Sequence, residues 1–346
     1  MRFIPFLILA VLIISACCRP PELQPQGLYQ NQLLICNEGI YTQTSGTVSG
    51  YNFDSQTATN NLFFLENGRE LGNVLQSICT HRDKVYFIVN NAQKIEVADR
   101  NTLKEYAQIR GLQQPRYMLP LNDSLAYVSQ WGANGLTGAL LLVNLYQNQI
   151  MQTTPTFKGA EKMLLYQNQL WLCHSGGYDS DNRLAIINSQ TQQIDTVIVV
   201  ADNPHSLQID QQARIWVACR GKAVYSNYPD VDTALSTAPA LYCFEGKRLI
   251  HVVNFDKNSS LNHLDKDASG RFLFFCHNNQ LLKFDTQNLT SQVIATGSFY
   301  GMNVINNELY AARSAGINPA QALRWTANGQ LLDSFEVGIF ANGFYQ

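Results

Sequence analysis

A short apolar run that follows a polar turn recurs along this chain, and its spacing constrains the fold more than any other feature. The copies are QLLICNEG (32–39), KVYFIVNN (84–91), SLAYVSQWG (124–132), QLWLCHSG (169–176), RIWVACRG (214–221), RFLFFCHN (271–278) and ELYAARSAG (308–316). Successive copies lie roughly 37 to 57 residues apart, mostly near 45. This period matches the four-stranded blade of a β-propeller, because each blade needs neighbours to bury its faces. No helical periodicity is evident.

We therefore predict an all-β fold, a seven-bladed β-propeller of four-stranded blades over residues 27–346. A strand precedes six of the seven copies and should be the innermost of its blade, at 76–80, 116–121, 161–166, 205–210, 263–266 and 302–305. The first copy has no such strand before it. We predict that residues 342–346 fill this place, with Phe344 and Tyr345 beside residues 33–36. This pairing would close the ring and leave no open sheet edge.

The first 16 residues are typical of a lipoprotein signal peptide. Met1-Arg2 is a short basic start, residues 4–14 are apolar, and Ile14-Ser15-Ala16-Cys17 resembles a bacterial lipobox. We predict that Cys17 is lipidated and that residues 17–26, rich in Pro and Gln, form a tether. The protein would then be anchored to the outer membrane of the cell envelope, facing either the periplasm or the outside. A plain secretory signal followed by an incidental cysteine is the alternative.

Charge composition argues against one class of partner. The chain has 24 Lys and Arg against 26 Asp and Glu, for a formal net charge of −2. Nucleic-acid-binding proteins usually carry a strongly basic surface, so nucleic acid is not an expected partner.

The Cys173–His174 pair raises the question of a metal or catalytic site. Cysteines hold the same place in four copies of the repeat, at Cys36, Cys173, Cys219 and Cys276. Equivalent positions in different blades are mostly too far apart for a disulfide, so we expect free, buried thiols rather than a bridge. No CxxC or HxxxH spacing is present, and no metal site is predicted. Cys173 should pack, and His174 should begin a loop.

One face of the ring is the predicted binding face. In a propeller the inner strand begins and the second strand ends on the same face, and the long insertions at 39–50, 131–138, 175–183 and 221–240 also lie there. The candidate ligand-binding residues are Arg116, Glu161, His205, His263 and Asn303 on the inner strands, and Trp131, His174, Tyr178, Arg220, Tyr225, Tyr228, His277 and Arg313 around them. Aromatic, cationic and amide groups together suit a large, flat, partly polar ligand.

Catalytic signatures are weak. The chain has no GxSxG, HExxH or Gly-rich phosphate loop, and Glu161 is the one clear carboxylate of the inner ring. No catalytic residue is therefore assigned. A lyase that uses Arg116, His205, His263 and Tyr300 stays open as an alternative.

A family resemblance sharpens the functional expectation. The motifs NEG (37–39), GRELGNVLQS (68–77), IEVAD (95–99) and GLQQPRY (111–117) together resemble the YncE-like seven-bladed propeller lipoproteins of Bacteroides-type bacteria. The resemblance covers about a quarter of the chain closely. It implies a non-enzymatic protein that captures cobalamin or a related corrinoid for a TonB-dependent outer-membrane transporter, with no other cofactor.

The matched residues belong mostly to the framework. Gly68, Gly72, Gly111 and Pro115 would shape turns, and Glu38, Arg69 and Arg116 would serve structure. Two other classes of function remain. One is a propeller enzyme of the lyase or lactonase type that acts on a carbohydrate or lactone. The other is a scaffold for protein partners on the same face.

Overall fold

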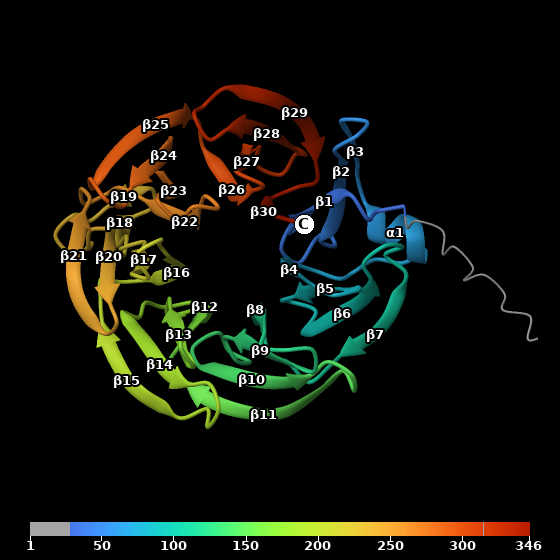
Figure 1. Cartoon of the computed structure of the whole chain (residues 1–346), viewed down its shortest axis with the longest axis horizontal. Coiled ribbons are helices and arrows are strands. Elements are labelled where there is room, and N and C mark those ends of the chain that lie inside the picture. The colour runs from blue at the N-terminus through green and yellow to red at the C-terminus, as the bar shows by residue number, and fades with distance from the viewer. Residues whose placement is uncertain (1–27, 314) are drawn as a thin grey trace, which may run out of the picture.

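The computed structural model describes residues 28–313 and 315–346, and these residues form seven four-stranded antiparallel sheets arranged in a ring (Figure 1). This confirms the predicted all-β, seven-bladed propeller. The predicted signal peptide, the lipidation site at Cys17 and the tether at 17–26 lie outside the described residues.

The blades are numbered in chain order. Blade 1 contains β1 (Gln32–Asn37), β2 (Thr47–Asn52), β3 (Thr57–Thr59) and β30 (Ala341–Tyr345); blade 2 contains β4 (Leu75–His81), β5 (Lys84–Val89), β6 (Lys94–Asp99) and β7 (Glu105–Ile109); blade 3 contains β8 (Pro115–Pro120), β9 (Leu125–Gln130), β10 (Gly138–Asn144) and β11 (Gln149–Thr156).

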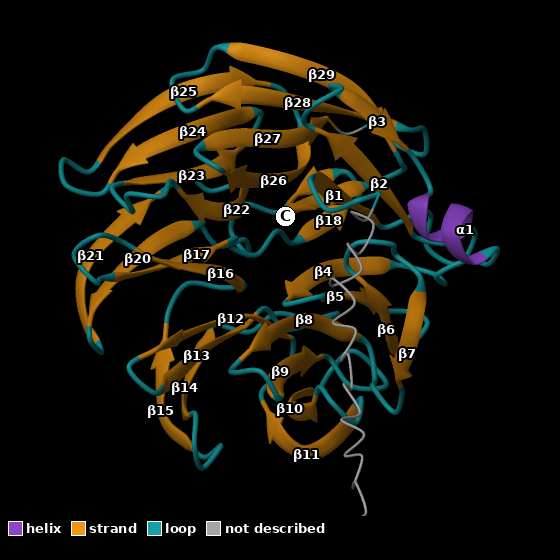
Figure 2. Cartoon of the chain, turned by 45° about the vertical axis from the view of Figure 1, so that its right-hand side comes forward, coloured by secondary structure: helices purple, strands orange, loops and turns teal. Residues whose placement is uncertain are grey.

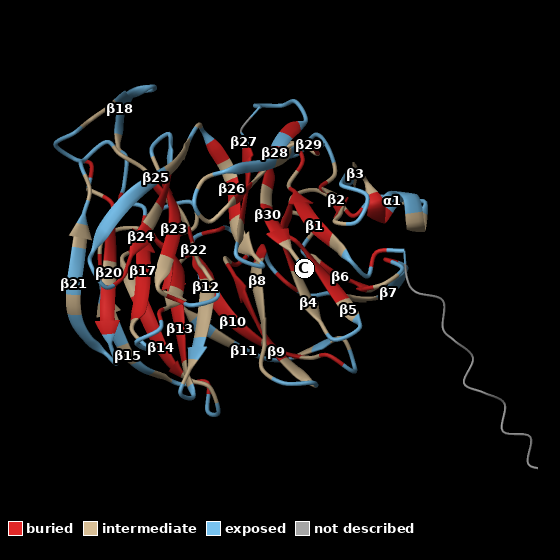
Figure 3. Cartoon of the chain, turned by 45° about the horizontal axis from the view of Figure 1, so that its top comes forward, coloured by how far each residue is buried: buried red, intermediate tan, exposed pale blue. Residues whose placement is uncertain are grey.

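The other blades follow the same plan. Blade 4 contains β12 (Ala160–Tyr166), β13 (Gln169–His174), β14 (Arg183–Asn188) and β15 (Ile194–Val199); blade 5 contains β16 (Pro204–Ile209), β17 (Ile215–Cys219), β20 (Ala240–Glu245) and β21 (Arg248–Asn254). Blade 6 contains β22 (Leu261–Lys266), β23 (Phe272–His277), β24 (Gln280–Asp285) and β25 (Thr290–Thr296); blade 7 contains β26 (Phe299–Ile305), β27 (Glu308–Arg313), β28 (Ala320–Thr326) and β29 (Leu331–Val337). A small hairpin, β18 (Tyr225–Asn227) and β19 (Asp230–Val231), projects from blade 5 (Figure 3).

The ring closes as predicted, through the C-terminal strand. β30 pairs antiparallel with β1, with Phe344 opposite Ile35 and Tyr345 opposite Leu34. Blade 1 therefore combines the two ends of the described chain, and its inner strand comes from the C-terminus. The strands β4, β8, β12, β16, β22 and β26 lie innermost in the other six blades (Figure 1), which confirms the six predicted inner strands.

The core lies between the blades. Buried apolar side chains form seven clusters, and each joins two neighbouring blades. The second strand of each blade is buried on both faces, while outer strands such as β15 and β21 alternate or are mostly exposed (Figure 3). This double burial explains the repeat in the sequence, because a strand covered on both faces reads as a continuous apolar run.

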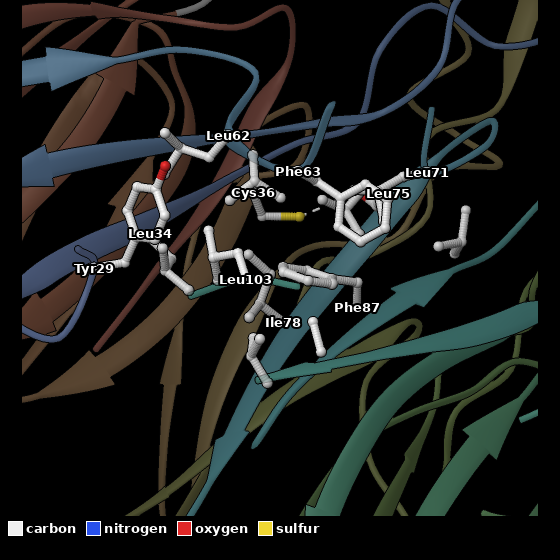
Figure 4. Close-up of a cluster of buried hydrophobic side chains, with 14 residues drawn as sticks. Tyr29, Leu34, Cys36, Leu62, Phe63, Leu71, Leu75, Ile78, Phe87 and Leu103 are labelled. Atoms are coloured by element: carbon white, nitrogen blue, oxygen red, sulfur yellow. Dashed lines mark hydrogen bonds between the residues drawn. The ribbon is translucent and has the colours of Figure 1, made fainter. Parts of the chain in front are cut away.

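A short helix, α1 (Leu62–Asn67), was not predicted and stands at the edge of the ring (Figure 2). It has six residues, fewer than two turns, so it leaves no periodic signal in the sequence. Leu62 and Phe63 enter the cluster between blades 1 and 2 (Figure 4), and Gly68 ends the helix with φ 66°. In the part of the chain that the structure describes, no helix is long and apolar enough to cross a membrane.

The cysteines pack as predicted. All six that the structure describes are free, and Cys36, Cys173, Cys219 and Cys276 are buried in the clusters between blades. Burial raises the pKa of the Cys173 thiol, so this thiol stays protonated and unreactive at neutral pH.

Candidate functional site

Every blade carries a β-bulge near the start of its inner strand. The bulged residues are Gln76 in β4, Arg116–Tyr117 in β8, Glu161–Lys162 in β12, His205 in β16, His263–Leu264 in β22, Tyr300 in β26 and Asn342 in β30. A bulge releases residues from the ladder and redirects their side chains. Here seven bulges direct polar or aromatic side chains toward the axis of the ring.

These side chains surround a central cavity of about 710 Å³. Its lining includes every bulged residue except Leu264, together with residues of the loops on the predicted binding face, among them Trp131, Ser175, Asn203 and Arg220. Seven of the 13 predicted ligand-binding residues line it, namely Arg116, Trp131, Glu161, His205, Arg220, His263 and Asn303. The volume lies within the range of small-molecule sites.

Arg116 is the centre of a hydrogen-bonded group on one side of the cavity. Its Nη2 lies 3.1 Å from Glu161 Oε1, its Nη1 donates to Gln76, and its guanidinium carbon lies 3.8 Å from the ring centroid of Trp131. Ser175 Oγ also donates to Glu161 Oε1, at 3.3 Å. Burial alone would lower the pKa of Arg116, but the neighbouring Glu161 raises it overall, so the guanidinium is charged at neutral pH.

A second group occupies the wall formed by blades 1 and 7. Tyr300 donates its hydroxyl hydrogen to Glu38 Oε2 at 2.6 Å, and Asn342 Nδ2 donates to Glu38 Oε1 at 2.8 Å. Burial, with the neighbouring Glu38 charge, raises the pKa of Tyr300. This tyrosine is therefore a hydrogen-bond donor at neutral pH and not a tyrosinate base.

The wall formed by blades 4, 5 and 6 carries cations and neutral imidazoles. Burial lowers the pKa of Lys162. Burial, reinforced by nearby Lys162 and Arg220, lowers the pKa of His263 to about 3, and the pKa of His205 is also lowered by burial. His205 Nε2 lies 3.1 Å from the Leu261 carbonyl and Nδ1 lies 2.6 Å from Ser206 Oγ, so both of its ring nitrogens are occupied.

The other six predicted residues do not line the cavity. Tyr178 lies at the mouth, 61% exposed, with its ring edge-on to Trp131 at 5.6 Å. Tyr225 and Tyr228 lie on the exposed β18–β19 hairpin. Arg313 is exposed at the end of β27, and His277 packs against Phe255 at 4.7 Å between ring centroids.

The expectation that His174 begins a loop is wrong. His174 is the last residue of β13 and is fully buried, with its ring 5.3 Å from that of Phe157. The bulge at Glu161–Lys162 presents those two residues to the cavity. His174 does not line the cavity and packs against Phe157 instead. Among the described residues its two ring nitrogens have no hydrogen-bond partner.

His174 should therefore destabilise the protein in mild acid. Burial lowers its pKa to about 4 in the folded protein, against about 6.5 in an unfolded chain. Only the unfolded state binds a proton in this window, so stability falls as pH drops from about 6.5 to about 4. Between pH 8 and pH 5, His174→Leu should gain about 2 kcal/mol in unfolding free energy relative to the parent, measured by urea denaturation.

The exposed His251 on β21 offers the matched control, His251→Leu. A parent protein and His174→Leu variant whose stabilities fall equally between pH 8 and pH 5 would contradict this account of the buried imidazole.

The cavity residues that sequence reasoning missed as ligand contacts include Tyr117, Lys162 and Tyr345. Tyr117 and Lys162 are the second residues of two-residue bulges. Strict alternation along a strand would point them away from the axis, and no sequence signal marks the bulge. Tyr345 was predicted only as a partner of the first blade. Among the described residues, no group of three or more His, Cys, Asp or Glu side chains is placed to hold a metal ion.

Comparisons with known proteins agree with the fold. A family described as "Domain of unknown function (DUF5074)" matches residues 31–320. A quinonprotein alcohol dehydrogenase-like protein from Bacteroides thetaiotaomicron has a TM-score of 0.63 at 11% identity, covering 91% of this chain and 77% of that one. A putative 6-phosphogluconolactonase from Bacteroides fragilis has a TM-score of 0.62 at 13% identity, covering 92% and 98%.

A functionally unknown protein from Desulfotomaculum acetoxidans has a TM-score of 0.63 at 12% identity, covering 91% of this chain and 98% of that one. At such identities the likeness concerns the fold alone, and the names of these proteins differ widely. No curated protein matches the chain.

Proposed function

Since this chain belongs to the DUF5074 family, whose description assigns no activity, we propose from its cavity that it is a non-enzymatic ligand-binding protein. The single observation that carries this proposal is the set of seven bulges that direct side chains into one cavity of about 710 Å³. A framework that repeats the same departure from regular pairing in every blade is suited to holding a ligand on its axis.

The ligand class that we propose is a corrinoid such as cobalamin. The cavity presents amide groups from Gln76, Asn262 and Asn342, and Asn342 Oδ1 has no partner among the described residues, so these groups can pair with the amide side chains of a corrin ring. Two aromatic rings at its mouth, the exposed Tyr178 and the half-buried Trp131, supply flat apolar area. A corrinoid is larger than the cavity, so part of it would enter while the ring rests on the mouth.

We further propose that the protein works at the cell envelope, anchored to the outer membrane through Cys17 and passing its ligand to a TonB-dependent outer-membrane transporter. The support is the order of basic start, apolar run and lipobox-like residues ahead of the propeller. The proposed tether at residues 17–26 would place the ring at a distance from the anchor, within reach of a partner in the membrane.

A second candidate function is a propeller enzyme of the lyase or lactonase type. One observation favours it: Arg116, His205, His263 and Tyr300 all line the cavity. The hydrogen bonding and protonation of these residues argue against an enzyme of this type. His205 has both nitrogens occupied, and the pKa of Tyr300 is raised by burial, so neither is prepared to take a proton at neutral pH.

Isothermal titration calorimetry of residues 28–346 against cobalamin and cobinamide tests the proposal. We expect a dissociation constant in the micromolar range or below, and a loss of about tenfold or more in Trp131→Ala because this ring lies on Arg116 at the mouth. Arg313→Gln, an exposed arginine of the same face outside the cavity lining, is the control. Absence of heat with both corrinoids at about 100 μM would remove this ligand class.

A further inference from the structure

We propose that the wall formed by blades 4, 5 and 6 contains a subsite for an oxyanion, a carboxylate or phosphate group, held by Lys162 and Arg220. This inference rests on the proposed function, because it assigns one part of the ligand to one part of the cavity. Both side chains line the cavity and come from neighbouring blades, Lys162 from the bulge of β12 and Arg220 from the residue after β17.

Lys162 is a cation without a counter-ion in direct contact. Among the described residues its ammonium has no ion-pair or hydrogen-bond partner, and its closest recorded neighbour is the ring of Tyr117, 5.5 Å from Nζ to the centroid. The adjacent carboxylate, Glu161, is held by Arg116 and Ser175 through Oε1. A half-buried ammonium that faces a cavity without a counter-ion in contact is stabilised when an anion binds beside it.

Arg220 is only partly used by the protein. Its Nε donates to Asn262 Oδ1 at 2.8 Å, which orients the guanidinium plane. Its two terminal nitrogens have no partner among the described residues. A guanidinium held at one edge and open at the other is arranged to receive a carboxylate or phosphate with two parallel hydrogen bonds.

The remaining groups of this wall do not neutralise the two cations by contact. Asp265 accepts hydrogen bonds from the backbone amides of Val304 and Lys266, at 2.9 Å each, and from Asn303 at 3.1 Å, so its oxygens are engaged within the protein. His263 stays uncharged at neutral pH, since burial and the two cations lower its pKa to about 3. It can add a neutral ring N–H beside the anion.

The wall opposite Lys162 and Arg220 contains a carboxylate, so the two sides of the cavity differ in their chemistry. Glu38, on blade 1, lies across the ring from blades 4 and 5 (Figure 1). Its carboxylate accepts hydrogen bonds from Tyr300 and Asn342, and no cation contacts it within the part of the chain that the structure describes. A ligand with an acidic group at one end and hydrogen-bond donors at the other would therefore bind in one orientation, with its acidic end toward Lys162 and Arg220.

Calorimetry with three simple probes tests the subsite: inorganic phosphate, the dicarboxylate glutarate, and glutaramide, which is its uncharged diamide. We expect phosphate or glutarate to bind and glutaramide not to, and the difference between the two acids tells whether a phosphate or a carboxylate is preferred. Lys162→Met and Arg220→Gln should each weaken binding of the acid about tenfold or more. Lys222→Met is the control. Lys222 is exposed, follows β17 as Arg220 does, and lies outside the central cavity.

Reductive methylation gives a second readout that does not depend on a folded variant. In the parent protein, phosphate or glutarate should slow methylation of Lys162 relative to Lys222, as read by mass spectrometry. Equal binding of glutarate and glutaramide, or unchanged methylation of Lys162, would overturn the subsite. Corrinoid binding that Lys162→Met leaves unchanged would also count against it while sustaining the proposed function. Binding of phosphate or glutarate without binding of a corrinoid would support the subsite and rule out a corrinoid as the ligand.

Discussion

Removing residues 341–346 is expected to prevent the propeller from forming a stable ring. This deletion takes away β30, the inner strand of blade 1, and leaves β1 with an unpaired edge toward the axis. It also removes Phe344, which is 1% exposed and packs between blades 7 and 1. An open ring exposes both a strand edge and an apolar interface, which favours aggregation. Soluble yield and the thermal unfolding transition measure the effect.

The size of this contribution can be measured with a single substitution. Phe344→Ala should lower the free energy of unfolding by about 3–5 kcal/mol, the usual cost of emptying a fully buried aromatic site. Leu331→Ala, at a position that is 53% exposed on β29, is the control and should change stability by less than about 0.5 kcal/mol. Equal effects of the two substitutions in urea denaturation would mean that the C-terminal strand does not close the ring.

Arg69→Met is expected to cost about 1.5–3 kcal/mol, since it removes the guanidinium from a buried carboxylate and leaves Lys94 as its remaining ion-pair partner. Glu96 on β6 has a side chain that is 1% exposed, and Arg69 Nη2 lies 2.5 Å from its Oε1. Burial alone would raise the pKa of Glu96, but hydrogen bonds from Arg69 and Lys94 lower it overall. The free energy of unfolding in urea at pH 7 measures the loss.

An exposed ion pair of the same type gives the matched control. Arg248 and Glu245 form a salt bridge in which the side chains are 72% and 62% exposed, so Arg248→Met should change stability by about 1 kcal/mol or less. A loss in Arg69→Met no greater than in Arg248→Met would contradict the role assigned to this pair.

The same pair explains part of the motif on which the family resemblance rests. The GRELG and IEVAD segments contain Arg69 and Glu96, and the ion pair joins the connection between α1 and β4 to β6 of blade 2. These residues therefore stabilise the framework and lie outside the cavity lining. The motif therefore combines framework residues with residues of the site, because Glu38, Gln76 and Arg116 also belong to it and line the cavity.

The ring itself could be predicted because its packing requires a simple pattern of apolar residues in the sequence. A strand such as β23 is buried on both faces, so its residues form an apolar run that any reader of the sequence can find. Closure by the C-terminus followed from counting, since one blade lacked an inner strand. The helix α1 could not be predicted, because only two of its side chains, Leu62 and Phe63, are buried and two residues form no periodic pattern.

The site could be predicted only in outline. The face and the inner residues Arg116, Glu161, His205 and His263 followed from topology, and all four line the cavity. Lys162 was not among the predicted residues, and it lines the cavity because a two-residue bulge in β12 interrupts the side-chain alternation of that strand. His174 was among them, but it is buried at the end of β13. Bulges depend on contacts with neighbouring blades, and a single sequence does not display those contacts.

The seven bulges separate the parts of this molecule that must stay fixed from those that are free to vary. A bulged residue is released from the regular pairing of its strand. Of the bulged residues only Leu264 belongs to one of the seven apolar clusters that hold the blades together. Gln76, His205 and Tyr300 could thus be exchanged for other side chains while the framework persists. One ring of this kind could be fitted with many different interiors, and a library randomised at these positions would be a source of new binding proteins.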